Sequence, residues 1–144
     1  MVWFDAHADF NTPETSPSGF LDGMAVAILT GRCWRSLAAQ ITGFEVVPES
    51  RVALVGIRDL DPPEADALAA SRVRRIGSDL TGLDAVFPQV VQRGSTLTWT
   101  SSIQEKDEAN QFATTGGLTA AQLVDAVRRL SRRPLHYRSC VHLI

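Results

Sequence analysis

Three side chains able to ligate a metal ion alternate near the start of the chain. Asp5, His7 and Asp9 directly follow the apolar residues 1–4. In extended backbone, residues i, i+2 and i+4 share one face, so the three could point into one site beyond a buried strand. Two carboxylates and an imidazole suit a borderline or hard divalent ion such as Mn²⁺. The alternative is a polar strand end whose histidine is satisfied by ordinary hydrogen bonds.

A second polar cluster follows another apolar run. Residues 52–57 form a continuous apolar stretch, typical of a buried parallel strand, and Arg58, Asp59 and Asp61 come next. Ligands of parallel sheets bind beyond the carboxyl ends of the strands, so both clusters should lie at the same edge. Asp61 is also a good N-cap for a helix, because Pro62 and Glu64 follow at first-turn and capping-box positions.

The remaining patterns predict alternating strands and helices, and hence an α/β fold with a mostly parallel sheet. Residues 6–23 read as a long polar loop of the kind that usually has a function. The expected elements are a strand at 1–5, a helix from Gly23 to about Leu29 that Gly31 could end, a helix from Pro62 to about Ser71, a short strand at 73–76, a helix at 83–91 interrupted by Pro88, and a helix capped by Thr119 with Leu123, Val127 and Leu130 on one stripe.

Composition bounds the class of protein. The 144 residues predict one domain, and a net charge of −2 gives no reason to expect nucleic acid or an anionic membrane as partner. Cys33 and Cys140 form no metal-binding pair and suggest a reducing compartment. No run is long and apolar enough to span a bilayer, so we expect a cytoplasmic protein. The cluster of Arg128, Arg129, Arg132 and Arg133 falls at a helix end, where it complements the helix dipole.

Three motifs in order resemble the arginase/agmatinase/formiminoglutamase (ureohydrolase) family. Asp5-Ala6-His7-Ala8-Asp9-Phe10-Asn11-Thr12-Pro13, with Ser18-Gly19 and Gly23, is similar to that family's second metal motif and substrate loop. Gly56 to Pro62 is similar to its substrate-side turn, and Thr115-Gly116-Gly117-Leu118-Thr119 to its late glycine motif. The loop at 5–23 is closest to arginase-like proteins.

The resemblance implies a three-layer α/β sandwich with two Mn²⁺ ions per site. A hydroxide shared by two metals about 3.5–4 Å apart would attack a guanidino or amidine carbon and release a urea-type product. Asp5 would match the carboxylate that bridges both metals, with His7 on one ion and Asp9 on the other. Asn11, Ser18 and Asp61 match positions that hold the substrate's amino-acid end. Turn formation by Asn11 and Ser18, and capping by Asp61, are the structural alternatives.

The departures from the family pattern concern the metals and the guanidinium. No glycine-rich motif with a ligand histidine precedes Asp5, and residues 95–104 contain no carboxylate where two ligand aspartates are expected. Asp22 stands where arginases have a proton-transfer histidine. Gln122 stands where they have a glutamate that pairs with the guanidinium, and a neutral amide cannot form that charge-assisted fork.

A reading-frame change could explain the altered stretch. Allowed codons for Leu97 to Gln104, read from the last base of the first codon, encode His-Leu-Asp-Val-Leu-Asp-Pro, which is close to the missing motif. The family pattern resumes after Glu108 and is lost again from Tyr137. The alternative is that residues 95–102 form an ordinary Thr/Trp-rich strand in a diverged protein.

We therefore expect residues 1–144 to be a single partial ureohydrolase-like domain, impaired in its manganese-dependent hydrolysis of linear amidines. At most one Mn²⁺ should bind, with a small guanidino or amidine molecule as ligand and self-association into a homo-oligomer allowed. One alternative is a catalytically inactive ligand-binding or assembly module of the same fold. Another is a different metal hydrolase, such as a deacetylase-like enzyme.

Overall fold

Five short strands form one parallel sheet at the centre of the molecule. The computed structural model describes residues 1–90, 96–99, 116–131 and 138–141, with the backbone alone for 96–99, 131 and 138–141. The strands are β1 (Val2–Phe4), β2 (Ala53–Val55), β3 (Arg74–Ile76), β4 (Thr96–Trp99) and β5 (Arg138–Val141), in the order β3-β2-β1-β4-β5. Every pairing is parallel, which confirms the predicted α/β class.

The strand order places the start of the chain in the middle of the sheet. From β1 the chain winds outward to β2 and β3, then crosses back to β4 on the other side of β1 and continues to β5. The direction of winding therefore reverses between β1 and β4. Ligands in open α/β sheets bind beyond the carboxyl ends of the strands at such a switch point. The residues that follow β1 are thus the best placed to form a site.

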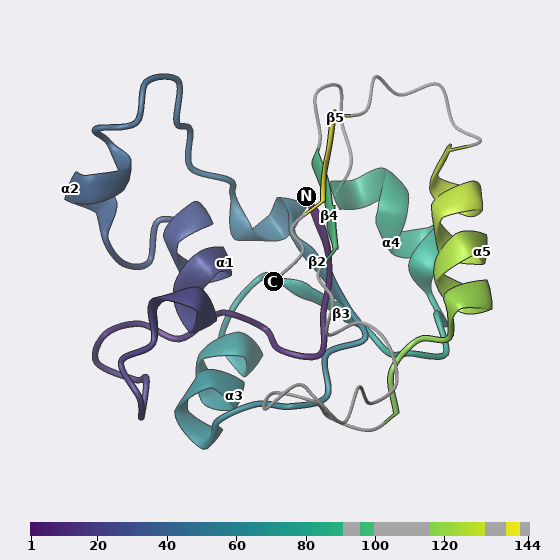
Figure 1. Ribbon diagram of the computed structural model, residues 1–144, viewed down its shortest axis with the longest axis horizontal. Coiled ribbons are helices and arrows are strands. Elements are labelled where there is room, and N and C mark those ends of the chain that lie inside the picture. The colour runs from purple at the N-terminus through teal and green to yellow at the C-terminus, as the bar shows by residue number, and fades with distance from the viewer. Residues whose placement is uncertain (91–95, 100–115, 132–137, 142–144) are drawn as a thin grey trace.

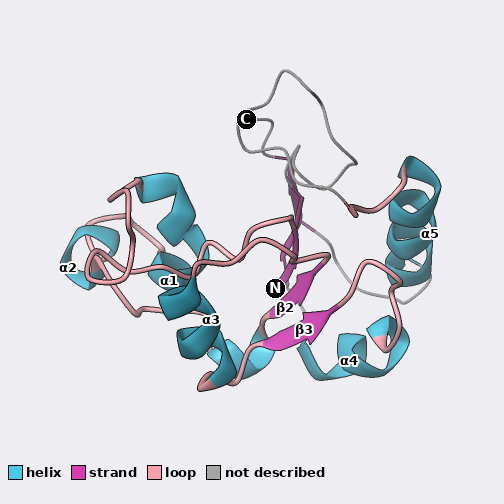
Figure 2. Cartoon of the chain, turned by 90° about the horizontal axis from the view of Figure 1, so that it is seen from below, coloured by secondary structure: helices cyan, strands magenta, loops and turns pink. Residues whose placement is uncertain are grey.

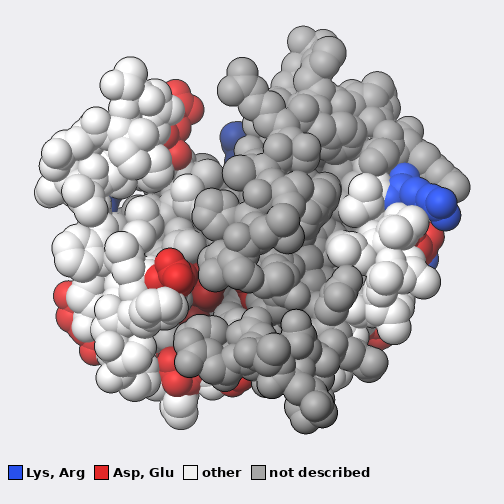
Figure 3. Space-filling view, viewed as in Figure 1, with Lys and Arg blue, Asp and Glu red and all other residues white. Residues whose placement is uncertain are grey.

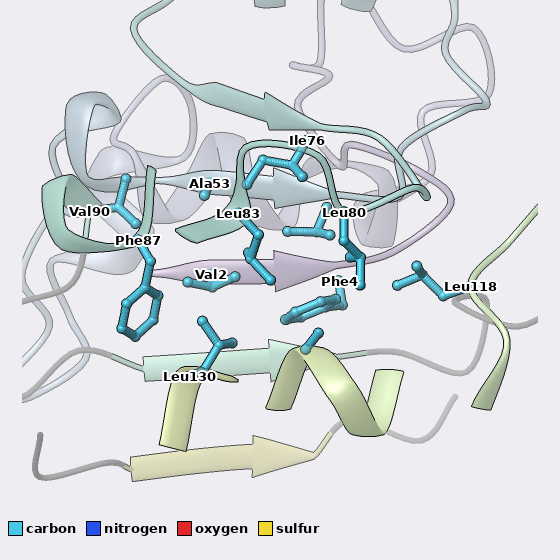
Figure 4. Close-up of a cluster of buried hydrophobic side chains, with 12 residues drawn as sticks. Val2, Phe4, Ala53, Ile76, Leu80, Leu83, Phe87, Val90, Leu118 and Leu130 are labelled. Atoms are coloured by element: carbon cyan, nitrogen blue, oxygen red, sulfur yellow. The ribbon is translucent and has the colours of Figure 1, made fainter. Parts of the chain in front are cut away.

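Alternate side chains of the central strands supply two hydrophobic cores. Val2 and Phe4 pack on one face of the sheet with Val55, whereas Trp3 packs on the other face with Leu54. Both faces are buried because the sheet lies between two layers of helices, which is why these strands are apolar at every position. Figure 4 shows the first core, in which Phe4 and Val2 of β1 face Leu83, Phe87 and Leu130.

The helices form the outer layers, as Figure 2 shows edge-on to the sheet. Helices α4 (Leu83–Val90) and α5 (Ala120–Ser131) cover one face and bury Phe87, Val90 and Leu130 against it. On the other side lie α1 (Ala25–Leu29), α2 (Arg35–Ala38), α3 (Pro62–Ala69) and the 3-10 helix η1 (Leu21–Met24). A second 3-10 helix, η2 (Glu49–Arg51), comes shortly before β2 and contacts α4. This arrangement is the three-layer sandwich that the resemblance implied.

The sequence predicts that Pro88 interrupts the helix at 83–91, and this prediction is wrong. Pro88 lies inside α4, and the helix is continuous from Leu83 to Val90. Leu83, Phe87 and Val90 are all buried, and this apolar stripe holds the segment against the sheet. The packing therefore outweighs the loss of the one backbone hydrogen bond that a proline nitrogen cannot donate.

The basic cluster at the end of α5 has acidic partners. Arg129 lies 2.7 Å from Asp125 and 3.4 Å from Asp84, and both carboxylates are exposed. Figure 3 shows basic atoms beside acidic ones over this end of α5. Arg128 and Arg129 occupy the last turn, where cations complement the helix dipole as predicted, whereas Arg132 and Arg133 lie outside the described residues.

Within the described part of the chain, no helix has the length and apolar character needed to cross a membrane.

Candidate functional site

The loops that follow β1 and β2 lie side by side at the carboxyl edge of the sheet. The backbone N–H groups of Arg58 and Asp59 donate to the Ala6 carbonyl at 2.8 and 3.1 Å, so the two loops continue the pairing of their strands. Gly56 lies at this junction with a φ of +84°, a conformation that glycine adopts without strain, and an added Cβ would be in van der Waals contact with the Asp5 carbonyl oxygen at 3.4 Å. The predicted meeting of the two polar clusters at one edge is confirmed.

Asp5 and His7 form the centre of this edge. The Asp5 side chain is buried, with the residue 3% exposed, and its Oδ1 accepts the His7 backbone N–H at 3.0 Å. The His7 ring presents Nδ1 to the same oxygen at 3.4 Å, and its Nε2 lies 3.8 Å from Asp59 Oδ2. The hydrogen bond to Asp5 raises the pKa of His7, although burial opposes it. The imidazole is therefore held between two carboxylates.

Asp9 is a partly buried carboxyl group in an acidic environment. Its backbone is left-handed, with φ of 49°, a conformation that Asp tolerates better than most residues, and its carbonyl accepts the Ala27 N–H at 3.1 Å. Burial raises the pKa of Asp9 to about 8, and the neighbouring charges of Asp5, Glu64 and Asp22 add to the shift. A proton or a bound cation would relieve this excess of negative charge.

The donor types at this edge suit a divalent cation. Carboxylate oxygens and an imidazole are the ligands that Mn²⁺ accepts, and the charge excess around Asp9 favours a cation. The residues therefore fit such an ion in the chemistry of their donor atoms. Among the residues that the structure describes, no group of three or more His, Cys, Asp or Glu side chains lies close enough together to hold a metal ion.

Asn11 and Asp61, both predicted to hold a ligand's amino-acid end, contact each other. Asn11 is buried, and its Nδ2 donates to Asp61 Oδ2 at 3.0 Å. Asp61 occupies the N-cap position of α3, but its side chain makes no capping hydrogen bond to that helix. Of the two interpretations that the sequence left open for Asp61, the structure therefore disfavours side-chain capping and directs the carboxylate toward the substrate-type loop.

The other two candidates of this loop are exposed. The Ser18 hydroxyl accepts the backbone N–H of Phe20 at 3.2 Å, which is the turn-forming arrangement that was its alternative. Asp22 is exposed on η1, yet its charge still contributes to the raised pKa of Asp9. Both residues therefore lie along the rim of the edge, away from the buried Asp5.

Glu64 is a residue whose role at the site the sequence pattern did not reveal. It was interpreted as part of a capping box, and a backbone hydrogen bond from Asp61 does reach it. The residue is also 4% exposed, and its Oε1 accepts the backbone N–H of Phe10 at 2.7 Å. Burial raises its pKa. A carboxylate at a capping-box position is ordinary, so no signal in the sequence pointed to this contact with the first loop.

The late glycine motif reaches the same edge of the sheet. Leu118 lies 3.9 Å from the position of a Cβ built on Gly56, and the Arg58 side chain is within 3.8 Å of one built on Gly116. Gln122 completes a capping box with Thr119, since its Oε1 accepts the Thr119 N–H at 2.8 Å. Its Nε2 donates to the Ser78 carbonyl at 3.2 Å, so the amide serves the start of α5. The predicted cap at Thr119 is confirmed.

The stretch with the altered pattern contributes a strand to the sheet. Thr96–Trp99 forms β4 beside β1, in register with Val2–Phe4, which agrees with the strand interpretation of that segment. Residues 100–115, where the expected ligand motif would continue, lie outside the described residues. The reading-frame hypothesis therefore stays a prediction.

The fold and the polar residues at the carboxyl edge of the sheet together define the class of protein. This is a doubly wound, parallel α/β domain of three layers, with acidic and imidazole side chains after the strand at its switch point. The model of the arginase family matches residues 1–99. The chain belongs to the arginase family.

Curated relatives match the chain over a limited segment. Over 64 residues it is 44% identical to the arginase of Staphylococcus aureus, a match that covers 44% of this chain and 20% of that protein. Over 68 residues it is 41% identical to human mitochondrial arginase-2, covering 44% of this chain and 19% of the relative. The matched segment thus spans about a fifth of the length of these relatives.

Solved structures match nearly the whole chain. The arginase of Bacillus subtilis superposes with a TM-score of 0.80 at 25% identity, covering 99% of this chain and 53% of that one. The arginase of Bacillus caldovelox gives a TM-score of 0.80 at 26% identity, with 99% and 51% covered. The proclavaminate amidino hydrolase of Streptomyces clavuligerus, at 16% identity and a TM-score of 0.63, shares the fold. The chain spans about half the length of these arginases.

Proposed function

We propose that this chain is a ureohydrolase-type domain that binds one divalent cation, preferably Mn²⁺, and a small guanidino or amidine ligand, with impaired hydrolysis of the ligand's C–N bond. The observation that carries the proposal is the placement of Asp5, His7 and Asp9 after β1, at the switch point of an arginase-family fold. The charge excess that raises the pKa of Asp9 to about 8 supports a cation at this position.

The residues divide into a metal side and a ligand side. Asp5, His7 and Asp9 would hold the ion, which when bound would supply Lewis acidity and lower the pKa of a water toward about 7. Asp5 is already oriented by the His7 backbone N–H, and its carboxylate fixes the ring of His7. Asn11, Ser18 and Asp61 would face the far end of the ligand. Asp22, on η1 at the rim, stands at the position of the family's proton-transfer histidine by resemblance.

Two substitutions weaken the expected chemistry. The carboxylates that would hold a second Mn²⁺ are missing from residues 95–104, so at most one ion should bind. Gln122 offers a guanidinium no negative charge, and its amide is engaged by Thr119 and Ser78. We therefore expect weak recognition of arginine and slow or no release of urea. We also expect a reducing, cytoplasmic environment and allow a homo-oligomer.

A catalytically inactive ligand-binding or assembly module of the same fold is the second candidate. The observations that favour it are that residues 95–104 contain no carboxylate and that Gln122 is a neutral amide engaged at the start of α5. In that case the fold and the ligand loop would be kept for binding alone. The geometry gives no further support to the deacetylase-like alternative. Hydrolysis of acetylated amines by the purified chain would support it.

Metal titration tests the proposal. The purified chain, stripped with a chelator, is titrated with Mn²⁺ by calorimetry and by electron paramagnetic resonance. We expect one weak site, lost in Asp9→Asn and kept in Asp66→Asn, which removes an exposed carboxylate from the outer side of α3. Two tight sites would contradict the mononuclear proposal, and no binding at all would favour the inactive module.

Turnover and gene sequence supply two further tests. Urea release from L-arginine and agmatine in excess Mn²⁺ should be absent or very slow, and rapid urea release would show that the site is not impaired.

Sequencing the gene across the codons for residues 95–108 tests the reading-frame hypothesis. Compensating frame changes there would mean that the parent protein keeps the missing metal motif, whereas a clean frame would mean that the second site has been lost.

A further inference from the structure

A directional chain of hydrogen bonds ends on Asp61. The backbone N–H of Thr12 donates to the Thr15 hydroxyl oxygen at 2.7 Å, and this hydroxyl donates to Asn11 Oδ1 at 3.0 Å. Asn11 Nδ2 then donates to Asp61 Oδ2 at 3.0 Å. Four groups from the loop after β1 and from the start of α3 are thus linked in one sequence. The Thr15 hydroxyl lies at the centre of this chain of hydrogen bonds, and neither the metal side nor the ligand side of the proposed site includes Thr15.

The acceptor at the end of the chain sets the direction of every bond. The Asp61 Oδ2 atom accepts the hydrogen bond from Asn11, so the side of the amide that faces Asp61 is the NH₂ group. The carbonyl oxygen of Asn11 then points to the other side, where it needs a donor because the residue is 6% exposed. Thr15 provides that donor.

The Thr15 hydroxyl can meet this need because accepting the Thr12 N–H uses a lone pair and leaves the hydroxyl proton free to donate. The single proton of the hydroxyl is left for one acceptor. The Thr12 carbonyl at 3.3 Å competes for that proton, but Asn11 Oδ1 is closer at 3.0 Å. The turn that brings these atoms together is closed by the N–H groups of Thr15 and Ser16, which donate to the same Thr12 carbonyl at 3.0 and 2.9 Å.

We propose that Thr15 is a positioning residue, which fixes the orientation of the Asn11 amide so that its NH₂ group faces Asp61. In the ligand-free protein the two ligand-side residues are thereby paired with each other. A ligand with an amino-acid end would then find Asp61 as an acceptor for its ammonium group and this NH₂ group as a donor for its carboxylate, both already oriented. The orientation of the amide follows from the hydrogen bonds alone, whereas the consequence for ligand binding rests on the proposed function.

Nuclear magnetic resonance of the Asn11 side chain tests the orientation directly. In the wild-type chain, nuclear Overhauser contacts should place the NH₂ protons away from the Thr15 side chain, and their exchange with water should be slow. Thr15→Val removes the hydroxyl at nearly constant volume, and the exchange should become about tenfold faster, as the loss of one hydrogen bond implies. Thr15→Ser should restore the wild-type rate.

Thr12→Val is the matched control, because it removes a hydroxyl from the same turn and keeps the backbone N–H that Thr15 needs. It should leave the exchange of the Asn11 amide unchanged. Equal exchange rates in Thr15→Val and wild type would overturn the proposal, and so would an equal effect of Thr12→Val. If Thr15→Val does not fold, the wild-type contacts still decide, since NH₂ protons next to Thr15 would contradict the assigned direction.

Binding of L-arginine to the Mn²⁺-treated chain separates this proposal from the proposed function. The dissociation constant should rise about tenfold in Thr15→Val and recover in Thr15→Ser, as expected for one hydrogen bond. Affinity unchanged in Thr15→Val would contradict a role in binding. If no variant and no wild-type sample binds L-arginine, the proposed ligand is wrong, while the exchange experiment still supports or overturns the positioning by Thr15.

Discussion

The backbone N–H of Phe10 donates to the buried Glu64 carboxylate at 2.7 Å, across 54 residues of sequence. This bond joins the loop after β1 to the first turn of α3. Phe10 is fully buried and carries Arg32 over its ring at 4.2 Å, so the loop is held from both sides. The carboxyl edge of the sheet is thus shaped by contacts between segments that are distant in the chain.

Replacement of Glu64 tests the importance of this bond. Glu64→Gln keeps an acceptor for the Phe10 N–H and removes a charge whose burial is unfavourable, so the free energy of unfolding should change little. Glu64→Met leaves the N–H buried without a partner and should cost about 1–3 kcal/mol. Urea denaturation measures both variants at one pH. Equal stabilities of the two would mean that the hydrogen bond is unimportant to the fold.

The glycine at the end of β2 should resist substitution for two separate reasons. Gly56→Ala places a methyl group in a left-handed conformation, at a cost of about 1–2 kcal/mol, and sets that apolar group in van der Waals contact with the polar Asp5 carbonyl oxygen at 3.4 Å. Gly82→Ala is the control, because its φ of +86° is similar and nothing lies within 4 Å of an added Cβ. Thermal unfolding should show the larger loss for Gly56→Ala. The same loss in both variants would show that the contact with Asp5 adds nothing.

The stability of the metal-free chain should fall as the pH rises from about 4 to about 8. The pKa of Asp9 is raised from 3.8 to about 8 in the folded chain, so the folded state holds a proton that the unfolded state releases in this window. The stabilisation is therefore complete below pH 3.8 and lost as the pH passes 8.

Denaturation at several pH values in chelator measures this slope. Asp9→Asn should flatten it, whereas Asp66→Asn, which removes an exposed carboxylate, should leave it unchanged. A slope that persists in Asp9→Asn would assign the effect to another group. If Asp9 is a metal ligand, excess Mn²⁺ should restore stability at pH 8 in the wild type and not in Asp9→Asn.

The capping box of α5 predicts an asymmetric response at Gln122. Gln122→Glu keeps an oxygen acceptor for the Thr119 N–H and adds a negative charge at a helix start, which offsets the lost bond to the Ser78 carbonyl. Gln122→Ala loses both contacts and should destabilise the chain by about 1 kcal/mol. Unfolding curves compare the two. If the Ala variant is as stable as the Glu variant, the box contributes little.

Local patterns were sufficient to predict most elements and the edge on which the polar clusters meet. The apolar runs at 1–4 and 52–57 became β1 and β2, and the Thr119 cap became the start of α5. These features depend on neighbouring residues in the sequence, because strand burial, turn chemistry and caps are set over a few positions. The continuous helix through Pro88 was missed, since the packing that holds it comes from other layers.

The sequence by itself determined the class of fold, the kinds of donor at the candidate site and the motifs that place the chain in its family. Tertiary structure alone decided which of these groups touch. Asp61, for which the sequence left two interpretations, became the partner of Asn11, Glu64 became a buried support for the first loop, and the Gln122 amide reached the Ser78 carbonyl. Hydrogen-bond partners fifty residues apart are chosen by the meeting of loops at the sheet edge, and no local spacing encodes that meeting.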